Sequence, residues 1–347
     1  MPKRILMAAG GTGGHIIPAL NVALALIKEK AEVFYVGNKN SMEYDIIKRN
    51  NINFYIINVQ KLYRKLTFKH LLFPFRLIIS IFMSIKYIKK IKPDAFIGFG
   101  GFVAGPVAIA AWMTKCPIYI QEQNCKPGIT NLWTGKIAYK VFLAYKESEK
   151  YFKKNNNIIT GNPVNIDITD IKQKSKNDKT ILILGGSQGS LFINNLILEN
   201  IDWFEQNRYK LIWQTGKNHL QRIKPLVTNN TCIEVLFDFT DQINNYYQKA
   251  DYVISRGGAL TLSEIEIYKI PSFIIPLSTA AVNEQYFNAK NIENRNMGML
   301  FEEKDKNLFK DRFLEFVNRS KDMFKEEYTS LHLNATENIV KILLEAK

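Results

Sequence analysis

Three glycine-rich segments of the chain could bring backbone amide groups close to an anion. They read GGTGG at 10–14 followed by His15, GFGG at 98–101 followed by Phe102, and GGSQG at 185–189. A glycine turn that opens a helix exposes N–H groups at the positive end of the helix dipole, where phosphates bind. One such loop is as often an ordinary strand-to-helix turn. Three in one chain favour a ligand that carries phosphate.

The spacing of these glycines argues against the common nucleotide motifs. The dinucleotide pattern GxGxxG needs glycine where Ile16 stands, and the third loop has Ser187 at its second glycine position. Gly37-Asn38 ends the second expected strand, where a ribose-binding acid would be required. No GxxxxGK[ST] sequence occurs, because Gly216-Lys217 lacks both the upstream glycine and the following hydroxyl residue. A nicotinamide or flavin enzyme and a P-loop NTPase are therefore disfavoured.

Each glycine loop must be positioned by a strand before it and a helix after it. An apolar run at 4–9 precedes the first loop, and apolar residues at helical spacing follow from 16 to 30. The same order of strand, turn and helix recurs at 180–184, 185–189 and 190–199. Further strands are expected at 32–36, 53–57, 95–98 and 118–121. Strands alternating with helices predict an α/β fold with parallel sheets covered on both faces.

The length and the turn-rich middle of the chain predict two domains. The 347 residues suffice for two domains at roughly 100–200 residues each. A polar passage at 155–179, which includes Gly161-Asn162-Pro163, is typical of a domain connection. We expect a first domain at 1–162, completed by a C-terminal helix at about 330–347, and a second at 163–329. The two Rossmann-like domains would face each other across a deep cleft.

The composition is that of a globular protein with a basic excess. Lys and Arg number 47 against 32 Asp and Glu, which gives a formal charge of +15, and 46% of residues are hydrophobic. This charge fits nucleic acid, but it also fits a lysine-rich surface bias. Cys116, Cys125 and Cys232 form no CxxC pair, which indicates a reducing compartment and no zinc ribbon.

Nine of the positive charges fall between Lys61 and Lys92, a stretch with no acidic residue. Apolar side chains alternate with them, yet Pro74 and Arg76 interrupt the run, which is shorter than the roughly 20 apolar residues of a transmembrane helix. The pattern fits a helix lying on an anionic membrane surface, and it also fits a core helix with a solvated face. The residues expected at the membrane are Leu72, Phe73, Phe75, Arg76, Ile79, Phe82, Lys86, Lys89 and Lys90.

Seven motifs in order give the chain a specific resemblance to the MurG glycosyltransferases. They are GGTGGH at 10–15, GFGGFVAGP at 98–106, EQN at 122–124, GNPV at 161–164, GGSQG at 185–189, SRGGALTLSE at 255–264 and EQYFNA at 284–289. The resemblance implies a GT-B fold. It also implies transfer of N-acetylglucosamine, with inversion, from its UDP donor to undecaprenyl-pyrophosphoryl-N-acetylmuramyl-pentapeptide, called lipid I, which becomes lipid II.

The resemblance implies no cofactor and no metal, and Asp167 and Asp170 are interpreted as solvated. It implies a peripheral protein on the cytoplasmic face of the cell membrane, where other cell-wall synthesis proteins would be partners. Nucleic acid is not expected to bind. The alternatives are another GT-B enzyme that uses a UDP-sugar, such as an epimerase, and, from a different class, a basic nucleic-acid-binding protein.

On the acceptor side, the resemblance makes His15 a candidate general base. An inverting displacement needs the proton of the attacking hydroxyl removed, and imidazole titrates near neutrality. His15 could equally position a phosphate, or only stabilise its loop. The other acceptor residues implied are Thr12, Gly13, Gly14, Gly100, Gly101, Phe102 and Asn124.

On the donor side, the resemblance makes Glu264 a ligand of the nucleotide sugar. The spacing of Thr261 and Glu264 also fits a capping box that opens a helix at 263–268. The backbone at 256–259 and at Ser187-Gln188 would meet the diphosphate. The donor residues implied are Thr12, Gly13, Gly14, Asn124, Ser187, Gln188, Arg256, Gly258, Ala259, Leu260, Thr261, Glu264, Gln285 and Asn288. Asn165, Gly257 and Glu284 depart from the family pattern.

Overall fold

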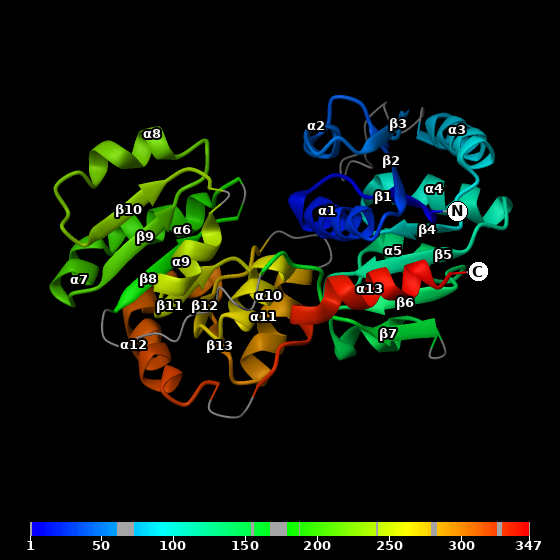
Figure 1. The fold of residues 1–347 in the computed structure, drawn as a ribbon. Coiled ribbons are helices and arrows are strands. Elements are labelled where there is room, and N and C mark those ends of the chain that lie inside the picture. Colours follow the sequence, from blue (N-terminus) through cyan, green and yellow to red (C-terminus); the bar gives the residue numbers. More distant parts are fainter. Residues whose placement is uncertain are drawn as a thin grey trace. The chain divides into compact units, whose positions relative to one another are not determined.

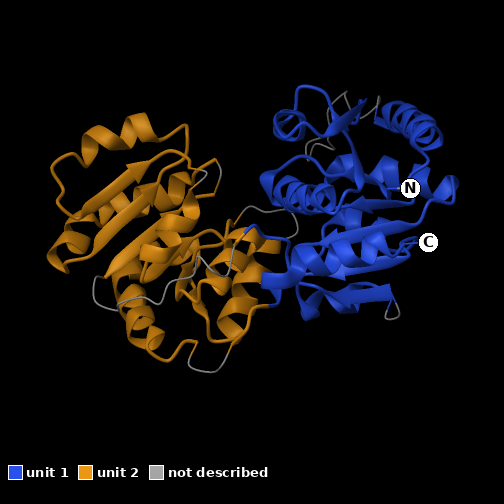
Figure 2. Ribbon diagram, in the orientation of Figure 1, with its two compact units in different colours: residues 1–165, 331–347 blue, residues 166–330 orange. Residues whose placement is uncertain are grey.

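The chain divides into two compact units of the α/β class. The computed structural model describes residues 2–60, 73–153, 156–166, 179–186, 188–240, 242–278, 283–324 and 328–346. Unit 1 comprises Met1–Asn165 and Leu331–Lys347, and unit 2 comprises Ile166–Ser330 (Figure 2).

In the described part of unit 1, seven parallel strands form one sheet in the order β3-β2-β1-β4-β5-β6-β7 (Figure 1). The strands are β1 (Arg4–Ala8), β2 (Glu32–Asn38), β3 (Asn53–Ile57), β4 (Ala95–Gly98), β5 (Ile118–Glu122), β6 (Lys140–Leu143) and β7 (Asn157–Ile159). Along β1, Ile5 and Met7 enter one hydrophobic core while Leu6 and Ala8 enter another. Because side chains alternate along a strand, this central strand is buried on both faces of the sheet.

Helices cover both faces of this sheet. They are α1 (Gly13–Lys28), α2 (Met42–Arg49), α3 (Phe73–Ile91), α4 (Gly101–Met113), α5 (Ile129–Thr134) and α13 (Ala335–Leu344). Apolar residues of α1 and α13 share the core of Ile5, while α3 and α4 share the core of Leu6. The C-terminal helix therefore belongs to the first sheet, although about 165 residues of unit 2 intervene.

In the described part of unit 2, six parallel strands lie in the order β10-β9-β8-β11-β12-β13. They are β8 (Thr180–Leu184), β9 (Lys210–Gln214), β10 (Ile233–Phe237), β11 (Tyr252–Ser255), β12 (Ser272–Ile274) and β13 (Gly298–Leu300). The α-helices are α6 (Leu191–Glu199), α7 (Ile201–Gln206), α8 (Leu220–Ile223), α9 (Ile243–Lys249), α10 (Ala259–Ile267), α11 (Glu284–Asn294) and α12 (Phe309–Ser320). Strand β8 repeats the pattern of β1, with Ile181 and Ile183 in one core and Leu182 and Leu184 in the other.

The predicted architecture of two α/β units with parallel sheets is confirmed. The strands expected at 53–57, 95–98 and 180–184 have the observed bounds, and the second strand continues two residues further, to Asn38. The first helix begins at Gly13, three residues before the predicted start, because Thr12 is already its N-terminal cap residue. Apolar periodicity identifies the buried part of a helix and misses a first turn made of glycines.

Two glycine loops of unit 1 touch backbone to backbone at the carboxyl edge of the sheet. Gly101 has a positive φ of +77°, and a Cβ on it would lie 2.1 Å from the carbonyl oxygen of Gly10. Gly11 has a φ of +93°, and a Cβ on it would lie 3.2 Å from the Phe102 ring. Glycine is thus required at Gly101 both by conformation and by the approach of the first loop.

We expect Gly101→Ala to destabilise unit 1 by ~2–4 kcal/mol, since it adds both backbone strain and a clash with Gly10. The matched control is Gly105→Ala in the same helix, where the nearest atom to a Cβ is Thr130 Cγ2 at 3.8 Å. Gly105→Ala should be neutral or stabilising, because alanine favours helices. Urea unfolding of both variants checks this, and equal midpoints would contradict it.

Candidate functional site

His15 lies in the first turn of α1 and has a defined partner on the next loops of the sheet edge. Its Nδ1 is 3.0 Å from Oε1 of Gln123, which follows β5. A Cβ on Gly100, at the start of α4, would lie 3.2 Å from His15 Cε1. Burial lowers the pKa of His15 below its usual 6.5, although Gln123 and the Phe99 carbonyl act in the opposite direction. The imidazole is therefore neutral at pH 7 and able to accept a proton.

A buried carboxylate organises the loop that carries Gln123 and Asn124. Glu122 is 1% exposed. One of its oxygens accepts hydrogen bonds from the backbone and side-chain amides of Asn124, at 2.9 and 3.0 Å. The other accepts from Asn131 Nδ2 at 2.9 Å and from the backbone of Gly128 at 3.3 Å. Asn124 is thus held by the neighbouring acid, so its side-chain amide already has one partner within the protein.

Of the three residues in the EQN motif, only Asn124 has a role that was predicted from the sequence; Glu122 and Gln123 have none. The signal that could have identified them is an acidic residue at the end of the fully buried strand β5, followed directly by an amide. Such groups need internal hydrogen bonds, because an unpaired buried polar group is costly. Asn131, which lies on α5, could not be found this way, since only the folded chain brings it to Glu122.

The first loop leaves amide groups of α1 without a side-chain cap. Thr12 is the N-terminal cap residue of α1, and its side chain makes no capping hydrogen bond. A Cβ on Gly13 would meet no atom within 4 Å. Helix α6 of unit 2 differs, because the Ser190 hydroxyl accepts from the Ile193 amide. The start of α1 can therefore donate backbone N–H groups to an anion.

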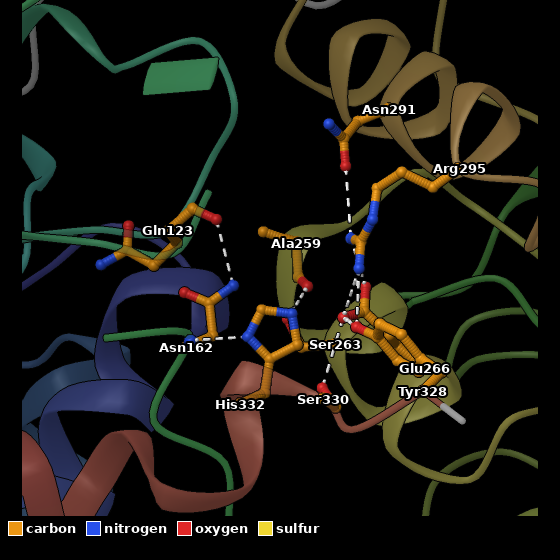
Figure 3. A network of polar contacts seen from close by, with 10 residues as sticks. All are labelled: Gln123, Asn162, Ala259, Ser263, Glu266, Asn291, Arg295, Tyr328, Ser330 and His332. Atoms are coloured by element: carbon orange, nitrogen blue, oxygen red, sulfur yellow. Dashed lines mark hydrogen bonds and ion pairs between the residues drawn. The ribbon is translucent and has the colours of Figure 1, made fainter. Parts of the chain in front are cut away.

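A second set of polar contacts in unit 1 joins the site loops to the C-terminal segment (Figure 3). Asn162 donates from Nδ2 to the carbonyl of Gln123 at 3.1 Å, and its backbone N–H donates to Nδ1 of His332 at 2.8 Å. Gln121 donates to Oδ1 of Asn162 at 3.1 Å. The GNPV motif thus holds the EQN loop in place through Asn162.

Within unit 2, Glu264 is a partly buried residue of α10. Its Oε2 accepts a hydrogen bond of 2.8 Å from the hydroxyl of Tyr247, a buried residue of α9. Burial raises the pKa of Glu264 to about 7, and the Tyr247 bond partly offsets this. Tyr247 stacks on Tyr268, with ring centroids 5.2 Å apart. The carboxyl group is thus held in one place and poised between its charged and neutral forms.

The capping-box interpretation of Thr261 and Glu264 is wrong. Helix α10 begins at Ala259 with Gly258 as its cap residue, so both residues lie inside the helix. A capping box needs the hydroxyl residue before the first turn. Here the helix starts earlier because Gly257-Gly258 ends the preceding loop.

The SRGG loop meets the start of α11. The amide of Asn288 donates to the Gly257 carbonyl at 3.1 Å, and Gln285 Oε1 accepts from the backbone of Leu277 at 2.9 Å. A Cβ on Gly257 would lie 2.3 Å from the carbonyl of Gln285, which accounts for glycine at this departure from the family pattern. Gly258 provides no side-chain cap for α10. The side-chain amide of Gln285 thus holds the segment at Leu277, and that of Asn288 holds the SRGG loop at Gly257.

The guanidinium of Arg256 also serves the loop that follows β12. It donates to the carbonyls of Ile275 and Pro276 at 3.0 and 3.3 Å and pairs with Glu303 at 2.6 Å. Among the other expected donor residues, Gln188 is exposed and Thr261 is partly buried, while Ser187 lies outside the described residues. Among the described residues, no group of three or more His, Cys, Asp or Glu is placed to hold a metal ion.

A third polar cluster, also in unit 2, holds the chain just before it returns to unit 1 (Figure 3). Glu266 is 2% exposed and forms an ion pair with Arg295 at 2.9 Å. The hydroxyls of Tyr328 and Ser330 both donate to Glu266. The residues before Leu331 are thereby fastened to α10, the helix that carries Glu264.

The first part of helix α3, up to Ser84, buries polar side chains and exposes apolar ones. Ser80 and Ser84 are buried, and they bond to the carbonyls of Asn58 and Ser80 respectively. Phe75 and Phe82 are 65% and 66% exposed. The remaining expected membrane residues are placed as follows: Ile79, Lys86, Lys89 and Lys90 are exposed, Phe73 and Arg76 are partly buried, and Leu72 lies outside the described residues. Ile88 and Ile91 are buried, as in a core helix, while the apolar side chains exposed earlier in α3 are among those expected at a membrane.

Helix α4 also exposes large apolar side chains, which the sequence pattern did not indicate. Trp112 and Met113, at the end of α4, are 60% and 56% exposed. Helices α3 and α4 pack against each other over the same core. Within the described residues, no helix combines the length and the hydrophobicity needed to cross a bilayer.

The sequence and the fold of the chain match those of a known protein family. Residues 5–143 match the glycosyltransferase family 28 N-terminal domain, and residues 180–338 match its C-terminal domain. A Flavobacterium psychrophilum protein is 35% identical over 99% of this chain and 97% of its own length. A Bacillus subtilis protein is 32% identical over 91% and 90% respectively. Both are named UDP-N-acetylglucosamine–N-acetylmuramyl-(pentapeptide) pyrophosphoryl-undecaprenol N-acetylglucosamine transferase.

The fold agrees with this assignment. The crystal structure of Acinetobacter baumannii MurG is 27% identical and superimposes with a TM-score of 0.81, covering 99% of this chain and all of that one. The chain therefore belongs to glycosyltransferase family 28 and, within it, to the MurG transferases.

Proposed function

We propose that the protein transfers N-acetylglucosamine from UDP-N-acetylglucosamine to lipid I and so forms lipid II. The observation that carries this proposal is the match to relatives of that name over nearly their whole length. The site geometry supports it, because a neutral imidazole at one glycine loop and a held carboxyl at another suit acceptor activation and donor binding. Unit 1 takes the acceptor and unit 2 the donor.

The proposed chemistry is a displacement at the anomeric carbon of the donor sugar. The acceptor hydroxyl forms the new C–O bond while His15 takes its proton, and the bond to UDP breaks with its electrons on the diphosphate. Backbone N–H groups at the start of α10, which has no side-chain cap, stabilise the departing charge. The backbone amides of Thr12, which caps α1, and of Gly13 and Gly14 in its first turn bind the acceptor pyrophosphate. No metal or cofactor takes part in this scheme.

The direct test is incubation of the protein with UDP-N-acetylglucosamine and a short-chain lipid I analogue. We expect disaccharide product and free UDP in equal amounts, because each transfer releases one UDP. Omitting the acceptor should stop UDP release. Epimerised donor, or UDP released without product, would replace the proposal with another UDP-sugar activity.

The raised pKa of Glu264 predicts that the affinity for the donor depends on pH. If its carboxylate accepts hydrogen bonds from donor hydroxyls, binding favours the charged form, and a pKa of about 7 leaves much of the free protein protonated near neutrality. The affinity for UDP-N-acetylglucosamine should therefore rise between about pH 6 and pH 8. Glu264→Gln should weaken binding by roughly 10- to 100-fold and remove the pH dependence.

Isothermal titration calorimetry at several pH values measures this effect. Tyr247→Phe is the informative companion variant, because it keeps the ring and removes the bond that lowers the Glu264 pKa. The rise in affinity should then occur at higher pH. A donor affinity that is flat across this range in the unmodified protein would remove Glu264 from the donor site.

The exposed face of α3 supports a peripheral location at an anionic membrane. Phe75 and Phe82 would enter the headgroup layer, and Lys86, Lys89 and Lys90 would meet lipid phosphates. An acceptor anchored in a bilayer makes such a surface useful, since the enzyme must work at the lipid interface. The proposed site is the cytoplasmic face of the cell membrane.

Vesicle flotation tests this surface. The protein should float with vesicles that contain phosphatidylglycerol and less well at high salt. Phe82→Ser should lower the partition coefficient about tenfold, the cost of losing one buried aromatic ring. Leu226→Ser is the control, because Leu226 is 61% exposed but lies in unit 2. Equal flotation of the two variants, or binding indifferent to lipid charge, would contradict the assignment.

A further inference from the structure

We infer that Gln123 is a positioning residue that keeps the proton of the neutral His15 ring on Nδ1 and leaves Nε2 as the atom that accepts a proton. This inference rests on the proposed role of His15 as the base. A neutral imidazole has one N–H and one bare nitrogen, and the partner of either nitrogen decides which is which. His15 Nδ1 has such a partner in Oε1 of Gln123, 3.0 Å away.

The orientation of the Gln123 amide follows from its other contacts. Its Nε2 lies 2.9 Å from the carbonyl oxygen of Phe99 and 3.2 Å from that of Gln121. It also lies 2.5 Å from the side-chain Oε1 of Gln121. These three atoms accept hydrogen bonds, so the NH₂ group must face them and the oxygen must face His15. An oxygen can only accept, and therefore Nδ1 is the nitrogen that carries hydrogen.

Hydrogen bonds hold the backbone on both sides of Gln123 as well as its side chain. Gln123 is 1% exposed, and its own carbonyl accepts from Asn162. The residue before it, Glu122, binds Asn124, Gly128 and Asn131, so that the turn after β5 is closed by a buried acid. The amide therefore cannot rotate away without breaking several internal hydrogen bonds.

An amide suits this place better than a carboxylate would. A carboxylate beside Nδ1 would also orient the ring, but its charge would raise the pKa of His15 and favour imidazolium. The influences on the pKa of His15 are burial, the Gln123 amide and the Phe99 carbonyl, and none of these is a charged group. The nearby carboxylate of Glu122 is directed to Asn124, Gly128 and Asn131. Gln123 thus orients the His15 ring without placing a charge beside it.

The tautomer can be measured directly by ¹⁵N NMR of the full-length protein labelled at histidine, at about pH 7.5. His15, assigned from the His15→Gln variant, should show hydrogen on Nδ1. His332 is an internal comparison with the opposite tautomer, because its Nδ1 accepts from the backbone N–H of Asn162. Gln123→Met should abolish the preference at His15 and leave His332 unchanged. Hydrogen on Nε2 of His15 in the unmodified protein would overturn the inference.

Kinetics distinguish positioning from mere structural support. Gln123→Met should lower kcat about 10- to 100-fold, part of the usual contribution of a general base, and leave the KM for UDP-N-acetylglucosamine unchanged. Gln123→Glu should restore part of kcat and move the acid limb of the pH profile up by about one unit. An unfolding midpoint close to that of the unmodified protein is required of both variants.

The role of His15 as the base and the positioning role of Gln123 can be disproved separately. If His15→Gln keeps its kcat, the proposed base is wrong and the role of Gln123 falls with it. If His15→Gln is inactive while Gln123→Met retains the kcat and pH profile of the unmodified protein, only the positioning role is wrong. Loss of kcat in Gln123→Met together with loss of the His15 tautomer preference supports both.

Discussion

The candidate acceptor site depends on a single buried acid, Glu122. Burying a carboxylate is costly unless donors surround it, and here four N–H groups from the next nine residues satisfy it. Those bonds close the turn between β5 and α5 and so hold Gln123 between them. Gln123 in turn meets the ring of His15. Glu122 therefore holds the loop around Gln123, yet it is not among the groups that shift the pKa of His15.

In unit 2, as at His15, a neutral side chain is the hydrogen-bond partner of an ionisable group. Glu264 is an ionisable group whose pKa is shifted by burial, and its partner, the hydroxyl of Tyr247, is neutral. In both units burial favours the neutral form, which leaves His15 uncharged and brings the pKa of Glu264 to about 7. A charged partner would have fixed either group in one protonation state. Neutral partners orient these groups without fixing their charge, which leaves His15 neutral and Glu264 able to exist in both protonation states near pH 7.

Local patterns predicted the strands and glycine loops well, because periodicity and turn chemistry act over a few residues. The partners of the site residues could not be found in this way. Tyr247 lies 17 residues before Glu264, on another helix, and Asn131 reaches Glu122 only in the folded chain. The capping box predicted from the spacing of Thr261 and Glu264 was wrong for a related reason. A capping box depends on where the helix starts, and α10 starts at Ala259, directly after two glycines. The site roles given to individual residues stay predictions.

Helix α3 shows why a sequence pattern alone left two interpretations open. A stripe of apolar residues states that one face avoids water, but not whether protein or lipid covers it. In the structure, α3 buries Ile88 and Ile91 together with Ser80 and Ser84, whose hydroxyls donate to backbone carbonyls, and it leaves Phe75 and Phe82 exposed. A cluster of exposed apolar side chains is a common mark of an interaction surface. The exposed Lys86, Lys89 and Lys90 of the same helix add positive charge, so the partner proposed for this surface is both apolar and anionic. A membrane meets both conditions, and a nucleic acid meets only the second.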